Sequence, residues 1–482
     1  MTSLALLTDL YELTMAYGYW RAGKVDDEAV FHLFFRENPF DGGYTIAAGL
    51  QPVIDYLDHL RFDDDDVAYL ATLTGNDGQP LFDRAFLDYL RRLELTCDVD
   101  AIAEGTVVFP HEPLVRVRGP IMQAQIIESA LLNVINFHSL IATKAARVVQ
   151  AARGDAVLDF GLRRAQGIDG ALAASRAAYI GGVAGTSNVL AGARFGIPTR
   201  GTHAHSWVMS FTTEREAFET YASVMPNNTM LLVDTYNTLE GVANAIEVGK
   251  KLREEGRKFV GIRLDSGDLA YLSIQARKML DEAGFTDAVI AASNDLDEHV
   301  ITSLKEQGAC VNVWGVGTRL ITAYDQPALG GVYKLSAIRR GGGAWEHKVK
   351  VSEQTIKVSN PGVLQVRRFV AGSQAVGDMI WDEASGAPES RTIIDPLDLT
   401  HRKRFDDSHQ AVDLLVPVYR KGVRVYEPPP LESVRELRAQ QLALFHPGVK
   451  RFVNPHRYPV GLETQLFDLK TRLVLEARGA GQ

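Results

Sequence analysis

The sequence predicts an α/β protein whose middle part forms a parallel barrel or a large doubly wound sheet, with the barrel favoured. Strand-like runs alternate there with helical stretches at a spacing of roughly 20 to 30 residues, as repeated βα units do. Polar residues and glycines gather directly after these runs, where the loops of such folds converge on one crevice. The expected strands cover residues 156–160, 179–184, 197–201, 230–234, 259–264, 288–292 and 310–314.

Composition narrows the class of protein. The chain has 482 residues, of which 46% are hydrophobic and 23% charged, as expected for a globular protein of two or three domains. Its formal charge of −9 gives no support to nucleic-acid binding. Cys97 and Cys310 lie far apart without metal-ligand spacing, which fits a reducing cytoplasm. Asp9 interrupts the first apolar run, so we expect neither a signal peptide nor a membrane span.

Residues 1–150 predict an N-terminal α/β domain. A strand begins near Ala29, and short strands are expected within 98–118 because β-branched residues alternate there with glycine and proline. The four carboxylates of 63–66 indicate a solvated loop or a helix start. Helices are expected at 8–22, 49–60, 81–93 and 121–149.

The rest of the chain divides at about residue 335. We expect the barrel domain to occupy 151–335, and the β-rich segments of 336–482 to pack back on the N-terminal domain. The prolines at 428–430 indicate a linker into a last helix at 431–444. The irregular stretch 445–462 that follows is expected to wrap over the surface.

Two histidines stand at the carboxyl end of the strand expected at 197–201. His203 and His205 are two residues apart, which places both imidazoles on the same face of a strand. Such a pair can start a metal site. Alternatively, one imidazole acts as a nucleophile or base while the other has a structural role.

Two further strand ends have the residue types of an anion site. Arg263 and Asp265 combine a cation that suits phosphate or carboxylate with an acid that suits a sugar diol or magnesium. The pair could also simply close the rim of a barrel. Gly315, Gly317 and Thr318 would let backbone amides and a hydroxyl approach a phosphate, although such glycines also occur in tight turns. The nucleotide loop and the dinucleotide fingerprint are absent from the sequence.

Five motifs together are specific for one family. They are Thr8-Asp9-Leu10-Tyr11, Asp159-Phe160-Gly161-Leu162-Arg163-Arg164-Ala165, Gly201-Thr202-His203-Ala204-His205-Ser206, Val233-Asp234-Thr235-Tyr236 and Arg263-Leu264-Asp265-Ser266-Gly267-Asp268. In them the chain resembles the nicotinate phosphoribosyltransferases over nearly its whole length.

The resemblance implies a fold, a reaction and an assembly. The fold would be an irregular parallel α/β barrel with an N-terminal α/β domain and a C-terminal extension. The enzyme would transfer the phosphoribosyl group of 5-phosphoribosyl-1-pyrophosphate to nicotinate, giving nicotinate mononucleotide and pyrophosphate. ATP hydrolysis and Mg²⁺ would accompany this first step of NAD salvage. The protein would be a homodimer whose active sites take residues from both chains.

The resemblance also implies a role for each matching residue. His205 would be phosphorylated by ATP, Asp234 would orient it, and His203 would be structural. Phe160 and Tyr11 of the partner subunit would sandwich the pyridine ring. The positions expected at the ribose phosphate are Arg263, Asp265, Gly315, Gly317 and Thr318, and basic residues expected near the polyphosphate are Lys334, Lys348, Lys350 and Lys357.

The choice between acid and amide as substrate depends on Ser187. Related nicotinamide-using enzymes carry an aspartate at this position, whose carboxylate accepts a hydrogen bond from the amide and would repel nicotinate. Ser187 removes that repulsion, and Arg163 lies where a cation would pair with the ligand carboxylate. Alternatively, Ser187 only caps the helix that follows it.

Three other functions remain to be weighed. A nicotinamide-using phosphoribosyltransferase is the nearest of these. A metal-dependent barrel hydrolase could use His203 and His205, but the next histidine, His299, falls in an expected helix, so further ligands are missing. A catalytically silent nucleotide sensor is disfavoured because His205 and Asp234 are retained together.

Overall fold

The computed structural model describes residues 3–388 and 390–479. The chain divides into two compact units. Unit 1 combines Met1–Leu140 with Ala328–Gln482, and unit 2 is Ile141–Pro327. The division falls inside α6 (Glu128–Ala151), whereas the expected boundary at 150 lies at the end of that helix.

Unit 1 contains an antiparallel sheet built from both ends of the chain. Its order is β13-β12-β1-β5-β3-β19-β20, and β1 pairs with β12 on one side and β5 on the other. The strands are β1 (Glu28–Phe34), β3 (Asp98–Ile102), β5 (Val115–Pro120), β12 (Val332–Arg339), β13 (Glu346–His347), β19 (Leu415–Arg420) and β20 (Val423–Arg424). The strands expected near Ala29 and within 98–118 are therefore confirmed.

A second sheet of unit 1 comes mainly from the C-terminal part, in the order β17-β16-β21-β15-β14-β18. Its strands are β14 (Leu364–Ala371), β15 (Gln374–Asp382), β16 (Thr392–Ile394), β17 (Arg402–Arg404), β18 (Gln410–Asp413) and β21 (Val460–Glu463). The expectation that 445–462 only wraps the surface is wrong at its end. β21 lies between β15 and β16, and Leu462 is fully buried.

The helices of unit 1 follow the sequence pattern up to residue 444. The expectation that the helix at 431–444 is the last one is wrong, because α16 (Thr464–Ala477) follows β21. The run of carboxylates at 63–66 starts a helix, because Asp63 and Asp66 form a capping box that satisfies the first backbone amides. The helices are α1 (Leu10–Arg21), α2 (Leu50–Asp58), α3 (Asp64–Leu70), α4 (Arg84–Arg91), α5 (Ile121–Ile126), α15 (Leu431–Ala443) and α16 (Thr464–Ala477), and the two-stranded pair β2 (Thr45–Ile46) and β4 (Val107–Val108) completes the unit.

Unit 2 is built on a parallel sheet in the order β7-β6-β11-β10-β9-β8. The strands are β6 (Ala156–Asp159), β7 (Gly185–Thr186), β8 (Met230–Leu232), β9 (Gly261–Leu264), β10 (Val289–Ala292) and β11 (Val313–Val316). Within the described residues this sheet is open, since the outer strands β7 and β8 do not pair with each other. An α/β fold is confirmed, and closure into a barrel is not.

Two expected strands of unit 2 are wrong. Tyr179 and Ile180 end the helix α7 (Gly167–Ile180), because its alanine-rich sequence favours a helix and both side chains continue its buried face. Residues 181–184 form no strand. Gly181 follows the last residue of this helix and is itself buried, and a Cβ there would lie 2.4 Å from the Ala145 side chain. Residues 197–201 form no strand, and only Thr199 makes a single parallel bridge, to Thr186.

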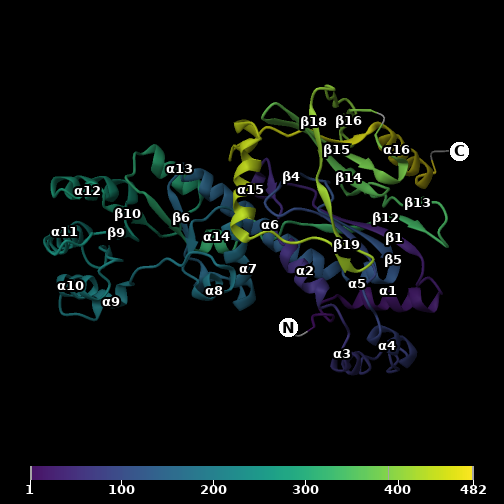
Figure 1. Cartoon of the computed structure of the whole chain (residues 1–482), viewed down its shortest axis with the longest axis horizontal. Coiled ribbons are helices and arrows are strands. Elements are labelled where there is room, and N and C mark those ends of the chain that lie inside the picture. The colour runs from purple at the N-terminus through teal and green to yellow at the C-terminus, as the bar shows by residue number, and fades with distance from the viewer. Residues whose placement is uncertain (1–2, 389, 480–482) are drawn as a thin grey trace. The chain divides into compact units, whose positions relative to one another are not determined.

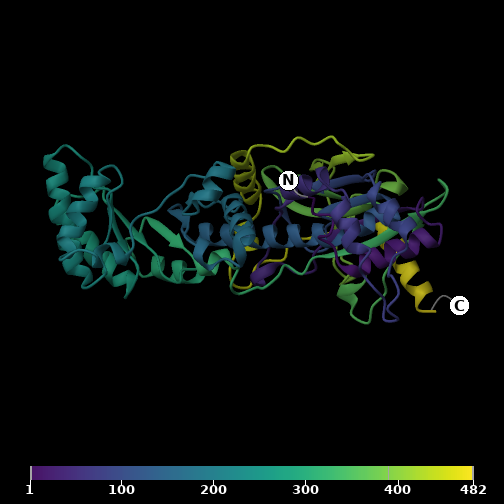
Figure 2. The same ribbon diagram turned by 90° about the horizontal axis from the view of Figure 1, so that it is seen from below.

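The helices of unit 2 pack along its sheet. α11 and α12 lie beside β9 and β10 in Figure 1, and the teal ribbon of Figure 2 shows the helices on the outer side of the strands. The helices are α8 (Val189–Phe195), α9 (His205–Met209), α10 (Glu214–Val224), α11 (Thr238–Glu254), α12 (Leu269–Glu282), α13 (Glu298–Glu306) and α14 (Thr318–Ile321). This arrangement leaves the carboxyl ends of the strands to the connecting loops.

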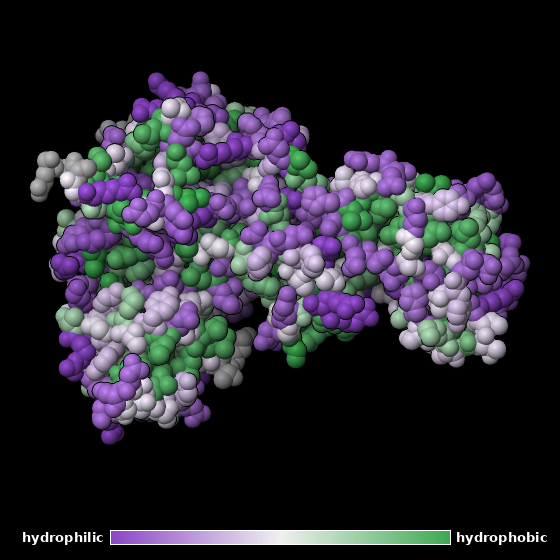
Figure 3. All heavy atoms as spheres, turned by 180° about the vertical axis from the view of Figure 1, so that it is seen from behind, coloured by the Kyte–Doolittle hydropathy of each residue, from purple (hydrophilic) through white to green (hydrophobic). Residues whose placement is uncertain are grey.

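The surface mixes residue types. On the face drawn in Figure 3, hydrophobic residues lie scattered among hydrophilic ones. The exposed apolar side chains of the molecule include Ile168 and Met209. Among the described residues, no helix has the length and apolar character needed to cross a membrane.

Candidate functional site

The carboxyl edge of the unit 2 sheet is organised by Asp159, the last residue of β6. Its buried carboxylate accepts hydrogen bonds of 2.8 Å from the Gly161 amide, the Ser175 hydroxyl and the Thr186 hydroxyl. Its carbonyl accepts from the Ser187 amide at 2.8 Å. Burial raises the pKa of the Asp159 carboxyl, and the three hydrogen bonds act against that rise. Asp159 therefore joins the ends of β6 and β7, a role that the sequence pattern did not reveal.

Phe160 lies over the neighbouring strand β11. The Phe160 amide donates to the Val316 carbonyl at 2.9 Å, and a Cβ at Gly315 would lie 2.4 Å from the ring of Phe160. Gly315 is inside β11 and not in the loop after it, so its expected place is wrong. Only glycine leaves room at this position for the aromatic ring.

The residues after β11 remain candidates for anion binding. Gly317 has φ −108° and ψ −107° and precedes α14, whose first residue is Thr318. The short helix has four residues, so its dipole is small, and any anion held here would depend on backbone amides and the Thr318 hydroxyl.

His205 is the first residue of α9, and its ring lies between the Thr235 hydroxyl and the Asp265 carboxylate, which belong to neighbouring loops. Its Nδ1 lies 3.1 Å from the Thr235 hydroxyl, and its Nε2 lies 3.8 Å from a carboxylate oxygen of Asp265. The His205 side chain is 39% exposed, so the ring is held and still open to a reactant.

Asp234, which is expected to orient His205, forms hydrogen bonds with other residues. One carboxylate oxygen accepts from the Asp265 amide at 2.8 Å and from the Ser266 hydroxyl at 2.7 Å. Its Oδ1 is buried without a hydrogen-bond partner among the described residues. The groups that meet the His205 ring are Thr235 and Asp265, because the strand β8 turns Asp234 toward the loop after β9.

Arg263 is mostly buried at the end of β9. Its guanidinium donates to the Thr202 hydroxyl at 2.6 Å, while its Nε has no partner among the described residues. Burial lowers the pKa of Arg263, the carboxylates of Asp265 and Asp234 act against this, and the nearby cation Arg163 lowers it further. Asp265 also accepts from the Ser293 hydroxyl.

His203 is buried and held by its neighbours. Its Nε2 accepts a hydrogen bond of 3.2 Å from the Leu232 amide, and its ring packs at 4.7 Å from the ring of Tyr221. Burial lowers the pKa of His203 to about 4. The lone pair of His203 Nε2 is thus occupied, and no group of three metal-ligating side chains is found in the described part of the chain.

Ser187 does not cap the helix after it. The residue before α8 is Asn188, whose side chain accepts from the Ala191 amide at 3.2 Å. The capping explanation for Ser187 is therefore wrong, which leaves its hydroxyl half-buried at the end of β7.

Other expected residues belong to unit 1. Tyr11 lies on α1 and is 48% exposed; burial raises the pKa of its hydroxyl, and the carboxylates Glu128 and Glu12 add to the rise. Lys334 is on β12, where burial lowers its pKa. Three other lysines are expected near the polyphosphate. Lys348 pairs with Glu346 at 3.0 Å, and the backbone amide of Lys350 donates to the Ser359 hydroxyl at 2.8 Å. Lys357 ends a short 3₁₀ turn.

Solved structures resemble this fold. A crystal structure of human nicotinic acid phosphoribosyltransferase matches with a TM-score of 0.84 and 33% identity, covering 97% of this chain and 99% of the other. A nicotinate-nucleotide pyrophosphorylase of Pyrococcus furiosus matches in fold, with a TM-score of 0.69 and 20% identity over 91% and 95%. Together with the groups at the strand ends, this fold defines an α/β phosphoribosyltransferase.

Sequence comparison narrows the class to one family. Models of the nicotinate phosphoribosyltransferase N-terminal domain, family and C-terminal domain match residues 6–136, 156–372 and 365–470. A nicotinate phosphoribosyltransferase of Bacillus subtilis is 44% identical over 99% of this chain and 96% of its own length. One of Mycobacterium tuberculosis is 41% identical over 97% and 94%. The chain belongs to the nicotinate phosphoribosyltransferase family.

Proposed function

We propose that this enzyme makes nicotinate mononucleotide and pyrophosphate from nicotinate and 5-phosphoribosyl-1-pyrophosphate, as a step of NAD salvage. ATP hydrolysis through a phosphorylated His205 drives the reaction. The observation that carries the proposal is the His205 ring, open to solvent and placed between Thr235 and Asp265 at the carboxyl edge of the sheet. The family membership of the whole chain supports the same conclusion.

His205 is suited to accept a phosphoryl group. A hydroxyl at Nδ1 fixes the orientation of the ring, so that Nε2 can act as the nucleophile. Asp265 lies at ion-pair distance from that nitrogen and stabilises positive charge on the ring. In this role Thr235 and Asp265 replace Asp234 as the groups that orient the histidine.

The phosphate groups of the substrates call for cations and amides. Arg263, whose Nε has no hydrogen-bond partner among the residues that the structure describes, and the amides of Gly317 and Thr318 supply such donors. Mg²⁺ takes one or two carboxylates together with substrate phosphates. Asp234 Oδ1, which no group in the described part of the chain contacts by a hydrogen bond, lies beside Asp265 and fits that need. The ion would neutralise the charge that develops on pyrophosphate as it leaves.

The pyridine ring is assigned to the end of β6. The Phe160 side chain offers an aromatic face beside Gly315, and Arg163, which is exposed and near Arg263, offers a cation for the carboxylate of nicotinate. Tyr11 of the partner subunit would cover the other face of the ring in a homodimer. The half-exposed Tyr11 on α1 supports this assignment. The unpaired Cys97 and Cys310 support a cytoplasmic location.

A steady-state assay of the purified full chain tests the function. We expect nicotinate mononucleotide and pyrophosphate to form from nicotinate and 5-phosphoribosyl-1-pyrophosphate, faster with ATP and Mg²⁺ than without. Nicotinamide in place of nicotinate is the matched control and should react far more slowly. Equal use of the amide would favour the nicotinamide-using alternative, and no product from either base would reject the proposal.

A further inference from the structure

Arg200 lies beside the outer strand β7, at the carboxyl edge of the unit 2 sheet. A single parallel bridge joins Thr186 of β7 to Thr199. The Thr186 amide donates to the Pro198 carbonyl at 3.0 Å, and the Arg200 amide donates to the Thr186 carbonyl at 2.9 Å. The backbone of Arg200 is therefore fixed to the end of β7, although it belongs to no regular strand.

The pairing register places Arg200 in one row with Phe160 and Ser187. The residue before each of them belongs to the row before, because Asp159 pairs with Thr186 and Thr186 bridges to the residue before Arg200. Neighbouring strands lie about 4.8 Å apart. Phe160, Ser187 and Arg200 therefore follow one another across the edge of the sheet at roughly that spacing.

The row of Phe160, Ser187 and Arg200 faces away from the helices that flank this edge. In the row before it, the Thr186 hydroxyl donates to the Asp159 carboxylate, which also accepts from Ser175 of α7, so those side chains point toward the helix. Successive side chains alternate between the two faces of a strand. The next row consequently points to the open face.

Two contacts support this direction for the Arg200 side chain. The Thr199 hydroxyl lies so close to Gly192 of α8 that a Cβ there would clash with it, so Thr199 faces the helix and Arg200 faces the other way. The Arg200 Cγ lies 3.2 Å from the place that a Cβ on Gly185 would take. Gly185 thus leaves room for the Arg200 stem to cross β7 on the face that carries the Phe160 ring.

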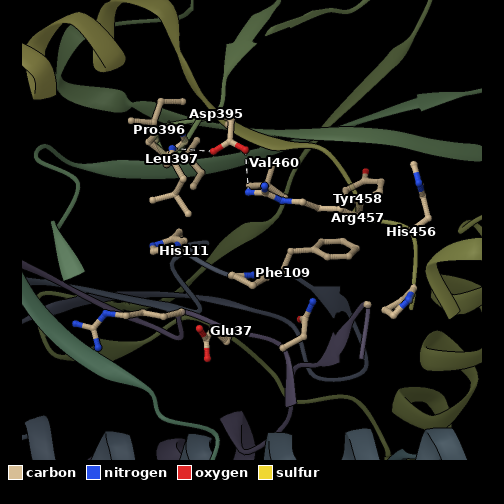
Figure 4. Close-up of a pocket in the computed structure, with 18 of the residues that line it drawn as sticks. Glu37, Phe109, His111, Asp395, Pro396, Leu397, His456, Arg457, Tyr458 and Val460 are labelled. Atoms are coloured by element: carbon tan, nitrogen blue, oxygen red, sulfur yellow. Dashed lines mark hydrogen bonds and ion pairs between the residues drawn. The ribbon is translucent and has the colours of Figure 1, made fainter. Parts of the chain in front are cut away.

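The Arg200 guanidinium pairs with no carboxylate among the described residues. Its one hydrogen bond there is a long one, of 3.4 Å, to the Thr199 carbonyl, and the residue is exposed. Arg457 provides a contrast. It lines a cavity of about 340 Å³ in unit 1, where its guanidinium is paired with Asp395 at 2.8 Å (Figure 4). The charge of Arg200 is therefore available to an anionic ligand.

We propose that Arg200 is a further specificity-determining residue, which binds the carboxylate of nicotinate on the side of Ser187 away from Phe160. The inference rests on the proposed function, in which the pyridine ring stacks on Phe160. A substituent of that ring would extend along the row, past Ser187, to a guanidinium that can donate two hydrogen bonds to a carboxylate. Arg163 belongs to the turn after β6, so the two cations would reach the carboxylate from different loops.

Steady-state kinetics of the full chain with Arg200→Met test this role. Methionine keeps an unbranched apolar stem over Gly185 and lacks the charge, whereas Arg200→Lys keeps the charge without the paired donors. Arg194→Met is the matched control, because Arg194 is an exposed residue in the last turn of α8 and lies outside the row. KM and kcat are measured for nicotinate, nicotinamide and 5-phosphoribosyl-1-pyrophosphate.

We expect Arg200→Met to raise KM for nicotinate at least about tenfold, and to change KM for nicotinamide and for 5-phosphoribosyl-1-pyrophosphate less than about twofold. Arg200→Lys should recover part of the loss, and Arg194→Met should behave as wild type. An unchanged KM for nicotinate in Arg200→Met overturns the inference. An equal loss for acid and amide, or a rise confined to 5-phosphoribosyl-1-pyrophosphate, overturns it as well.

Failure of this inference can be told apart from failure of the proposed function. Wild-type enzyme that makes nicotinate mononucleotide, together with an unaffected Arg200→Met variant, rejects the role of Arg200 alone. Wild-type enzyme that makes no nicotinate mononucleotide rejects the proposed function and this inference together.

Discussion

At the scale of single residues, the proposed roles of His205 in phosphoryl transfer and of Ser187 in substrate choice can be tested directly. The orientation of the His205 ring follows from contacts at both of its nitrogens, with Thr235 and with Asp265. Ser187 lies at the end of β7, where its amide donates to the Asp159 carbonyl. Its hydroxyl is not needed to cap the next helix, because Asn188 does so. Each can be tested by one substitution whose effect a general loss of structure would not reproduce.

Replacing His205 by alanine removes the proposed phosphoryl acceptor. We expect His205→Ala to lose ATP hydrolysis and the stimulation of synthesis by ATP, with slow transfer remaining because substrate positioning is separate from energy coupling. After incubation with ATP, wild-type enzyme should carry acid-labile, base-stable phosphate, and the variant should not. ATP hydrolysis at the wild-type rate in a folded variant would contradict the assignment.

Substituting Ser187 by aspartate should shift the substrate preference from the acid toward the amide. Two negative charges about 4 Å apart at an effective dielectric of about 20 repel by roughly 4 kcal/mol, which weakens nicotinate binding by roughly a thousandfold. We expect Ser187→Asp to lower kcat/KM for nicotinate far more than for nicotinamide. Ser187→Asn, similar in size and uncharged, is the control. An unchanged ratio of the two specificity constants would place the discrimination elsewhere.

At the scale of elements, the packing of β6 against β11 decides where the aromatic platform lies. The ring of Phe160 occupies the space above Gly315, and the Asp159 carboxylate holds the turn that carries it. In unit 1, α1 is fixed in a similar way through Glu12, which is fully buried and accepts from Ser129 at 2.7 Å and from Thr8.

A side chain at position 315 should displace the Phe160 ring. We expect Gly315→Val to raise KM for nicotinate, since lost aromatic stacking costs about 1 to 3 kcal/mol. Gly170→Ala is the matched control, because a Cβ there meets no atom within 4 Å. Thermal unfolding of both variants separates a local change from loss of fold. Wild-type KM in Gly315→Val would show that Phe160 does not stack on the base.

Glu12 should make the stability of the chain depend on pH. Burial raises the pKa of Glu12 from its ordinary 4.5 to about 7, and the nearby carboxylate of Glu128 adds to the rise. Between these two pH values the folded chain keeps a proton that the unfolded chain has lost, so the stability that this group contributes falls as pH rises. We therefore expect the stability of Glu12→Gln relative to wild type to increase from about pH 4.5 to 7 and then level off.

Denaturant unfolding at a series of pH values measures this difference. Glu436→Gln, an exposed change on α15, is the control and should show no such trend. A stability difference between Glu12→Gln and wild type that stays constant across the window would rule out a raised pKa at Glu12.

At the scale of the whole molecule, the proposal requires two chains for each active site. Tyr11 lies in unit 1 and His205 in unit 2, and the aromatic cover of the pyridine ring is assigned to the partner subunit. A two-fold dimer in which each site borrows one residue allows defects on different chains to complement each other.

Mixed dimers of Tyr11→Ala and His205→Ala chains should recover activity. In each mixed dimer one site has both residues intact and the other has neither, so we expect about half of the wild-type activity. Differently tagged chains allow the mixed dimers to be purified, and the two homodimers are the controls. Mixed dimers no more active than the homodimers would show that the site is not shared.

The sequence by itself determined the elements whose signal is local. The helices expected at 49–60 and 81–93, and the strands that precede Phe160 and Asp265, follow from propensity, periodicity and turn residues. The motifs were likewise enough to identify the family, because they combine residue types at fixed spacing.

Tertiary structure decided what depends on neighbours distant in sequence. β21, which the irregular sequence of 445–462 did not predict, is a central strand because β15 and β16 pair with it from both sides. The partners of His205 and the role of Asp159 also lay beyond the sequence pattern. Each depends on which strand ends meet in space, and that is set by long-range packing and not by local propensity.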